Sequence, residues 1–99
     1  KIAQGYGGFF RPNENVTREQ MALMMYNYAK LQGCDVSAQS GLTTFSDTGM
    51  ISTQTLKAVR WANAVGLLNG VSGGRLDPKG LITRAQIASI LMNYRENVL

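Results

Sequence analysis

The chain has 99 residues, a formal net charge of +4, one cysteine and no histidine, and 44% of its residues are hydrophobic. This length suits one small domain. The lack of histidine excludes a Ser-His or Cys-His nucleophile, and the single Cys34 rules out a disulfide within the chain and a zinc cluster. We therefore expect no catalytic residue, no metal and no cofactor. The positive charges are scattered and favour an anionic partner only weakly, and no apolar run is long enough for membrane insertion.

Residues 17–32 are predicted to form the first helix. Thr17 and Gln20 have the spacing of a capping box, in which the threonine hydroxyl accepts the N3 backbone N–H and the glutamine reaches back to the cap. Gly33 is expected to end the helix. The apolar side chains that share one helical face are Met21, Met24, Met25 and Tyr28.

A linker and a middle helix follow. Residues 33–44 are small and polar, which is typical of a loop between two units. The middle helix is predicted from about Thr53 to Val65, with Ser52 or Thr53 as its N-cap and Gly66 as its breaker. Its apolar surface is broad for a short helix, and this predicts packing on two sides.

The last part of the chain repeats the design of the first. Residues 66–82 are rich in glycine and are predicted to form a compact turn, in which Asp77 is biased to an extended backbone because a proline follows it. Residues 83–97 are predicted to form a helix, with Thr83 and Gln86 as a second capping box.

One sequence motif occurs twice, 66 positions apart. Residues 7–28 align with residues 73–94 through matching Gly-Gly, Pro, Thr-Arg, Gln, Ala and Asn-Tyr positions. Each copy of such a motif is one supersecondary unit that cannot bury its apolar face alone. The two copies are therefore expected to share a core.

The motif also predicts how the chain is divided. The segment 45–70 leads into the second copy, and its counterpart for the first copy would precede Lys1. We therefore expect the chain to be a fragment of a longer protein. Its expected parts are the back half of one repeat at 1–32, a linker at 33–44 and a complete repeat at 45–97.

Five short motifs stand in order along residues 45–95. They are Phe45-Ser46-Asp47, Trp61-Ala62-Asn63-Ala64-Val65, Gly74, Pro78 and Thr83-Arg84-Ala85-Gln86. Together they resemble a surface-layer homology (SLH) repeat, a family with an F-x-D start, a W-A-x-x-A-V stretch, a glycine-rich turn with F-x-P and a T-R-A-E signature. Two positions depart from that pattern: Leu76 replaces the aromatic residue of the turn, and Gln86 replaces the glutamate.

The resemblance implies an all-α fold, in which SLH-type helix–loop–helix repeats contribute helices to a three-helix-bundle core with groove-forming loops. Neighbouring SLH repeats, or another chain, would complete this core. The implied function is non-covalent anchoring of an exported bacterial surface protein to the cell wall, through an anionic secondary cell wall polysaccharide that commonly carries a pyruvate ketal. The implied location is extracellular, at the cell surface.

Two arginines are the main candidates for contact with such a polymer. Arg18 and Arg84 follow the helix caps, where a planar guanidinium can pair with a ketal carboxylate through two parallel hydrogen bonds. The helix N-terminus also favours an anion, by roughly 0.3–1 kcal/mol at exposed positions. The alternative is that Arg84 pairs with Asp47 or another carboxylate and only holds the repeat together.

Asp47, Trp61, Gly74 and Gln86 complete the predicted ligand-binding site. Asp47 either binds a sugar hydroxyl or accepts hydrogen bonds within a turn. Trp61 either covers the apolar face of a sugar or belongs to the core. Gly74 either lets a ligand approach the backbone or only shapes a tight turn. Gln86 still caps its helix but lacks the charge of the family's glutamate.

Two other functions are compatible with the same residues. The first is a protein–protein assembly module built from SLH-like repeats. The second is a basic helical module for nucleic acid, because a capped helix after a glycine turn can mimic a helix-turn-helix. The final helix offers little basic surface beyond Arg84 and Arg95, so we expect no nucleic-acid partner.

Overall fold

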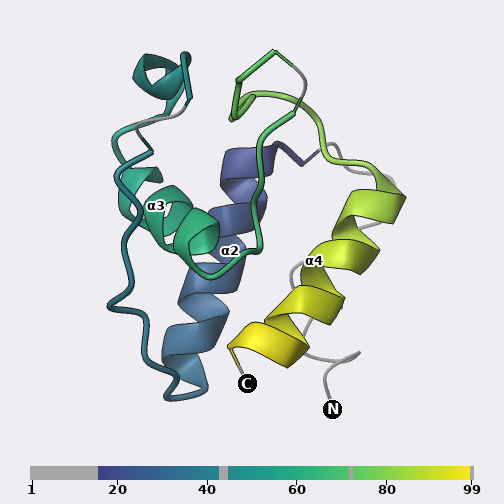
Figure 1. Cartoon of the computed structure of the whole chain (residues 1–99). Coiled ribbons are helices and arrows are strands. Elements are labelled where there is room, and N and C mark those ends of the chain that lie inside the picture. The colour runs from purple at the N-terminus through teal and green to yellow at the C-terminus, as the bar shows by residue number, and fades with distance from the viewer. Residues whose placement is uncertain (1–15, 43–44, 72, 99) are drawn as a thin grey trace.

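The structure, a computed structural model, describes residues 16–42, 45–71 and 73–98. These residues form the helices α2 (Arg18–Leu31), α3 (Leu56–Ala64) and α4 (Arg84–Asn97) and the short 3-10 helix η1 (Thr48–Met50) (Figure 1). The predicted all-α fold class is confirmed for this part of the chain, where strand-like pairing is limited to two isolated bridges. None of the described helices is long and apolar enough to cross a membrane.

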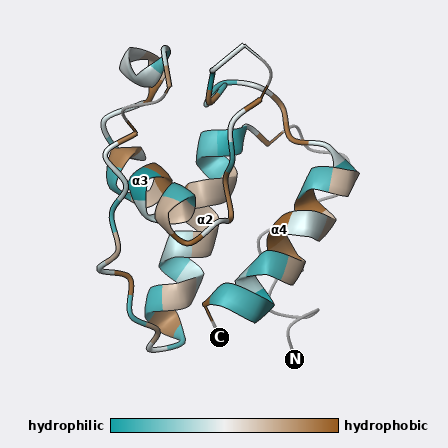
Figure 2. Ribbon diagram, in the orientation of Figure 1, coloured by the Kyte–Doolittle hydropathy of each residue, from teal (hydrophilic) through white to brown (hydrophobic). Residues whose placement is uncertain are grey.

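The helices α2 and α4 begin in the same way, as the repeated motif predicts. The Gln20 backbone N–H donates to Thr17 Oγ1 at 3.2 Å, and the Thr17 N–H donates to Gln20 Oε1 at 2.9 Å. Thr83 and Gln86 form the same capping box at the start of α4. Figure 2 shows hydrophilic residues at both helix starts. The Gly-Gly and Pro positions of the first copy, Gly7, Gly8 and Pro12, lie outside the described residues.

The start of α3 differs from the prediction. The helix begins at Leu56, and its N-cap is Thr55 rather than Ser52 or Thr53. The Thr55 side chain accepts no capping hydrogen bond from the helix. The hydroxyl groups of Ser52 and Thr55 instead both donate to the carboxylate of Glu19, which ties this segment to α2. The end of α3 is as predicted, because Gly66 follows with a φ of +83°.

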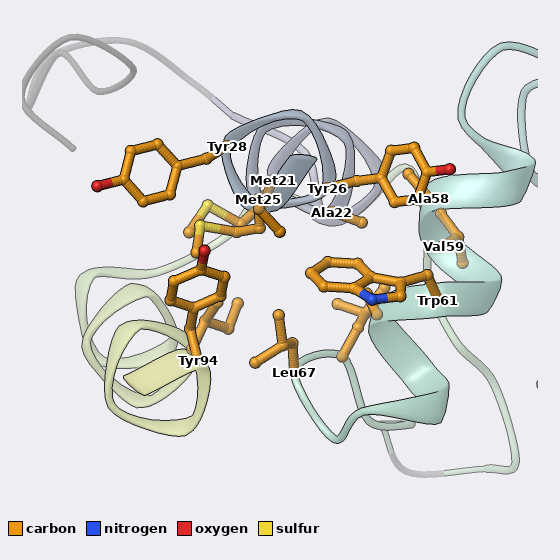
Figure 3. Packing of buried hydrophobic residues seen from close by; sticks show 14 of the residues in the cluster. Met21, Ala22, Met25, Tyr26, Tyr28, Ala58, Val59, Trp61, Leu67 and Tyr94 are labelled. Carbon is orange, nitrogen blue, oxygen red and sulfur yellow. The ribbon is translucent and has the colours of Figure 1, made fainter. Parts of the chain in front are cut away.

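The three helices enclose one core (Figure 3). α3 packs directly on α2, where the Tyr26 and Trp61 ring centroids lie 5.6 Å apart at an interplanar angle of 70°. α4 joins the core through Tyr94, whose ring centroid lies 5.9 Å from that of Tyr28. The bundle implied by the family would combine the second helices of neighbouring repeats. The described residues supply two such helices, α2 and α4, so the three-helix bundle stays a prediction.

The segment between α3 and α4 forms the compact turn that its glycines predict. The Val71 N–H donates to the Arg75 carbonyl oxygen at 2.8 Å. Gly70 is required here, because an added Cβ would lie 2.5 Å from Cε1 of the Phe45 ring. Asp77 has a φ of +57° instead of the predicted extended backbone. Asp77 lies in a turn that is held on both sides, because Asp47 accepts the backbone N–H groups of Leu76 and Asp77 and the Gly80 N–H donates to the Asp77 carbonyl oxygen at 3.1 Å.

Candidate functional site

The start of α2 is docked on the turn that precedes α4. The backbone N–H of Arg18 donates to the Gly80 carbonyl oxygen at 2.9 Å, and that of Glu19 donates to the Pro78 carbonyl oxygen at 3.0 Å. These are two of the first-turn N–H groups that have no partner within a helix. Residues more than 50 positions away in the sequence therefore complete the cap of α2.

The buried side chain of Arg18 also binds the segment between α3 and α4. Only 6% of the residue is exposed, and its guanidinium donates to the carbonyl oxygens of Leu76, at 2.9 Å, and Asn69. Burial lowers the pKa of Arg18 below its ordinary value, and the nearby carboxylates of Asp77 and Asp47 partly oppose this effect. Arg18 thus holds the first copy of the motif against the turn of the second.

Glu19 makes a second set of buried contacts between α2 and the rest of the chain, and the sequence alone did not identify it as a site residue. Its residue is 5% exposed, and its carboxylate accepts the Ser52 N–H at 2.9 Å, the Ser52 hydroxyl at 2.8 Å and the Thr55 hydroxyl at 3.1 Å. Lys79 Nζ lies 2.7 Å from Glu19 Oε2. Burial alone would raise the pKa of Glu19, but the hydrogen bonds from Lys79, Ser52 and Thr55 outweigh it and hold the pKa below its ordinary value. The only sign of this role in the sequence was that the second copy of the motif has Ala85 at the position of Glu19.

Asp47 organises the other side of the turn. Its Oδ1 accepts the Leu76 N–H and its Oδ2 accepts the Asp77 N–H, both at 2.8 Å. The hydrogen bond from Leu76 is the main reason that the pKa of Asp47 lies below its ordinary value. Asp47 therefore acts as a turn acceptor, one of its two predicted roles, while hydroxyl binding by the same carboxylate stays a prediction.

A small groove lies beside this turn, with a volume of about 170 Å³. We call it the turn groove, and the residues that line it are Asp47, Met50, Arg75, Asp77, Pro78 and Lys79. Arg75 is exposed and the Lys79 side chain is 51% exposed, so two cations and two carboxylates line one depression. Within the described ranges, no three His, Cys, Asp or Glu side chains gather closely enough to hold a metal ion.

The other predicted site residues lie elsewhere. Arg84 is exposed at the start of α4 and has no ion pair or side-chain hydrogen bond with the described part of the chain, so it does not pair with Asp47. Gln86 completes the α4 capping box. Gly74 is exposed with a φ of +69°, and its carbonyl oxygen accepts the Ser46 N–H at 3.0 Å. The structure thus brings Arg18 and Asp47 to one turn and leaves Arg84 and Gln86 at another helix start.

Trp61 lies in the core, which is one of its two predicted places. The residue is 0% exposed, and its Nε1 has no hydrogen-bond partner among the described residues. Its ring is therefore covered by other protein atoms and is not exposed to solvent. Of the residues that line the turn groove, only Asp47 was predicted; the other five, Met50, Arg75, Asp77, Pro78 and Lys79, were not among the predicted contacts.

Comparison with known proteins gives one family and several long relatives. The family model described as "S-layer homology domain" matches residues 1–22 and 44–88. The exoglucanase XynX of Acetivibrio thermocellus is 32% identical over 95 residues, which are 96% of this chain and 9% of the relative. The amylopullulanase of Thermoanaerobacterium thermosulfurigenes is 38% identical over 96 residues, or 96% of this chain and 5% of the relative.

A third relative is named for anchoring. The cellulosome-anchoring protein of Acetivibrio thermocellus is 31% identical over 98 residues, which cover 96% of this chain and 21% of the relative. The chain therefore spans only a small part of each of these proteins. No solved structure matches the chain significantly.

Proposed function

Since this chain belongs to the S-layer homology domain family, whose members act as anchors at the cell surface, we propose that it attaches a larger exported protein by binding an acidic cell wall polysaccharide. The acidic group is proposed to be a pyruvate ketal, which presents a carboxylate on a rigid sugar. Catalysis in the parent protein would then belong to other domains, as the lengths of the enzyme relatives suggest. The proposed partner is the polymer alone, with no metal or cofactor.

The turn groove is the observation that carries this proposal. The exposed guanidinium of Arg75 is proposed to pair with a ketal carboxylate through two parallel hydrogen bonds, while Lys79, which lines the same groove, is already paired with Glu19. The carboxylates of Asp47 and Asp77 supply acceptors for sugar hydroxyls. The Asp47 hydrogen bonds hold the backbone of the turn in place before any ligand arrives, which lowers the entropy cost of binding.

Arg84 is a second candidate contact for the polymer. It is exposed at the first position of α4, where the helix dipole also favours an anion. Arg18 is buried and its guanidinium binds two backbone carbonyl oxygens, so we assign it the role of holding the backbone of the turn at Leu76, between the groove residues Arg75 and Asp77. Gly74, Gln86 and Trp61 are given no direct contact in this proposal.

The test is a retention assay on purified wall polymer, before and after removal of its pyruvyl groups. We expect Arg75→Ala to weaken retention by roughly tenfold or more, since hydrogen bonds to charged groups contribute roughly 1.5–3 kcal/mol. Arg95→Ala is the matched control, because it removes the same guanidinium charge from an exposed position near the end of α4 that does not line the turn groove. Circular dichroism would establish that each variant keeps its helical content.

Each outcome of this assay decides one part of the proposal. Equal retention of intact and depyruvylated polymer would remove the carboxylate from the mechanism. If Arg75→Ala did not change retention, the turn groove would no longer be the proposed binding site. A steep fall in binding with the logarithm of the salt concentration, together with binding to nucleic acid, would favour the basic-module alternative instead.

A further inference from the structure

Two of the four charged side chains that line the turn groove already have partners, and two do not. Lys79 Nζ lies 2.7 Å from Glu19 Oε2, and the Asp47 carboxylate accepts two backbone N–H groups of the turn. The side chains of Arg75 and Asp77 form no hydrogen bond and no ion pair with the described part of the chain. The groove therefore offers a ligand one free cation and one free carboxylate.

The two free charges come from one short segment of the turn. Leu76, which stands between them in the sequence, is 0% exposed, whereas Arg75 is exposed and Asp77 is half-buried. Both of these charged side chains line the groove. The Asp77 carboxylate also lies against the backbone of Gly80, where an added Cβ would overlap it. A ligand in the groove therefore meets a guanidinium and a carboxylate together.

The charges at the groove and directly behind it balance. The three cations and three carboxylates are Arg18, Arg75, Lys79, Glu19, Asp47 and Asp77. A purely anionic ligand would bind Arg75 but would be repelled by the free carboxylate of Asp77, since like charges at short range raise the energy. A ligand with one anionic and one cationic group avoids this repulsion and satisfies both free side chains.

We propose that Asp77 is a specificity-determining residue of the turn groove, and that the groove takes an acidic sugar unit that also carries a free amino group. This inference rests on the proposed function, in which Arg75 pairs with the ligand carboxylate. There Asp77 accepts a sugar hydroxyl, but a protonated amine supplies three N–H donors and a charge that offsets the carboxylate. An N-acetyl group at the same position supplies one N–H donor and no charge.

Asp77 also has a structural role, which the test must separate from ligand selection. Burial lowers the pKa of Arg18, and the negative charge of Asp77 opposes this effect. Removal of that charge therefore bears on the stability of the fold through Arg18. A role in ligand selection would instead change the preference between two ligands, which a purely structural role would leave unchanged.

The test compares muramic acid with N-acetylmuramic acid, two single sugars that share a carboxylate and differ at the amino group. At about pH 6 a free amine of this kind is protonated. Titrations followed by the NMR shifts of the Leu76 and Asp77 backbone amides locate binding at the groove and give dissociation constants. We expect muramic acid to bind roughly 3- to 10-fold more tightly, between the gain from an exposed ion pair and that from a hydrogen bond to a charged group.

Asp77→Asn is the decisive variant, because asparagine keeps the shape of the side chain and tolerates the φ of +57° at this position. We expect it to bind the two sugars about equally. Asp35→Asn is the matched control, which makes the same change at an exposed position outside the groove and should keep the preference. Arg75→Ala should weaken the binding of both sugars to a similar degree. Urea unfolding of Asp77→Asn measures the structural role separately.

Three results would overturn the inference: equal binding of the two sugars by the original chain, tighter binding of N-acetylmuramic acid, or binding of neither sugar. A preference for muramic acid that persists in Asp77→Asn would overturn the role of Asp77. These results leave the proposed anchoring function standing, because the retention of wall polymer decides that function on its own. Conversely, a preference for muramic acid without any retention of the polymer would contradict the anchoring function alone.

Discussion

Tyr28 and Tyr94 occupy the same position in the two copies of the motif, and their rings meet in the core with centroids 5.9 Å apart and planes inclined by 54°. Two equivalent helices thus face each other through the same residue. Tyr94 is 0% exposed and Tyr28 is 8% exposed, so this contact lies inside the module. It joins α4 to the core together with the buried Ile90.

Truncation of Tyr94 should therefore uncouple α4 from the rest of the core. Tyr94→Ala removes a fully buried aromatic ring, and we expect a loss of about 3–5 kcal/mol in the free energy of unfolding. Chemical denaturation followed by circular dichroism measures it. The control is Met92→Ala on the exposed side of the same helix, which should change stability by about 0.5 kcal/mol or less. Similar losses for both variants would contradict the core assigned here.

The two arginines of the repeated motif should differ in their effect on stability. Arg18→Ala leaves the Leu76 and Asn69 carbonyl oxygens without their buried donor, and we expect a cost of about 2–3 kcal/mol. Arg84→Ala removes an exposed side chain, and a change of about 0.5 kcal/mol or less is expected. Thermal and urea unfolding of the two variants provide the comparison. Equal losses of stability in the two variants would show that Arg18 does not make these buried hydrogen bonds.

Acid should weaken the junction between α2 and the turn. The folded-state pKa values of Glu19 and Asp47 both lie below their ordinary values of 4.5 and 3.8. The folded state therefore binds fewer protons than the unfolded state, and stability is lost as the pH falls through the folded-state pKa values. We expect a nearly constant melting temperature at neutral pH and a decline below about pH 4.5.

Glu19→Gln separates the contribution of this buried carboxylate from general acid effects. The variant should be less stable at pH 7, because it loses the charge that pairs with Lys79, and its stability should fall less steeply in acid. Glu96→Gln, which alters an exposed residue near the end of α4, is the control and should keep the acid profile of the original chain. If Glu19→Gln left the dependence of stability on pH unchanged, Glu19 would not contribute to the loss of stability in acid.

The glycine turn should be intolerant of a side chain at Gly70, whereas Gly49 in η1 should tolerate one. Gly70→Ala places a Cβ 2.5 Å from the Phe45 ring and 3.2 Å from the Arg75 carbonyl oxygen, so we expect a destabilisation of about 1–3 kcal/mol. At Gly49 a Cβ would meet nothing within 4 Å, and Gly49→Ala should be close to neutral. Unfolding midpoints of the two variants give the difference, and two equal midpoints would argue against the packing of Phe45 on the turn.

The features that were predicted correctly are those with local causes. A capping box joins residues three positions apart, so the pairs Thr17 with Gln20 and Thr83 with Gln86 locate the starts of both long helices from the local sequence alone. Gly33 and Gly66 have positive φ where the helices end, as expected of residues without a Cβ.

The features that were missed depend on residues far apart in the sequence. Glu19 binds Ser52, Thr55 and Lys79, which are 33 to 60 positions away in the sequence. Periodicity placed Trp61 on an apolar face but left open whether sugar or protein covers it. The residues that line the turn groove come from two separate segments of the chain, so only the folded structure could identify them.

The residues that bind the start of α2 all follow it in the sequence. The partners of Arg18 and Glu19 lie between Ser52 and Gly80. When the chain is synthesised from its N-terminus, α2 therefore emerges before any of these partners, and the junction can close only after the turn has followed.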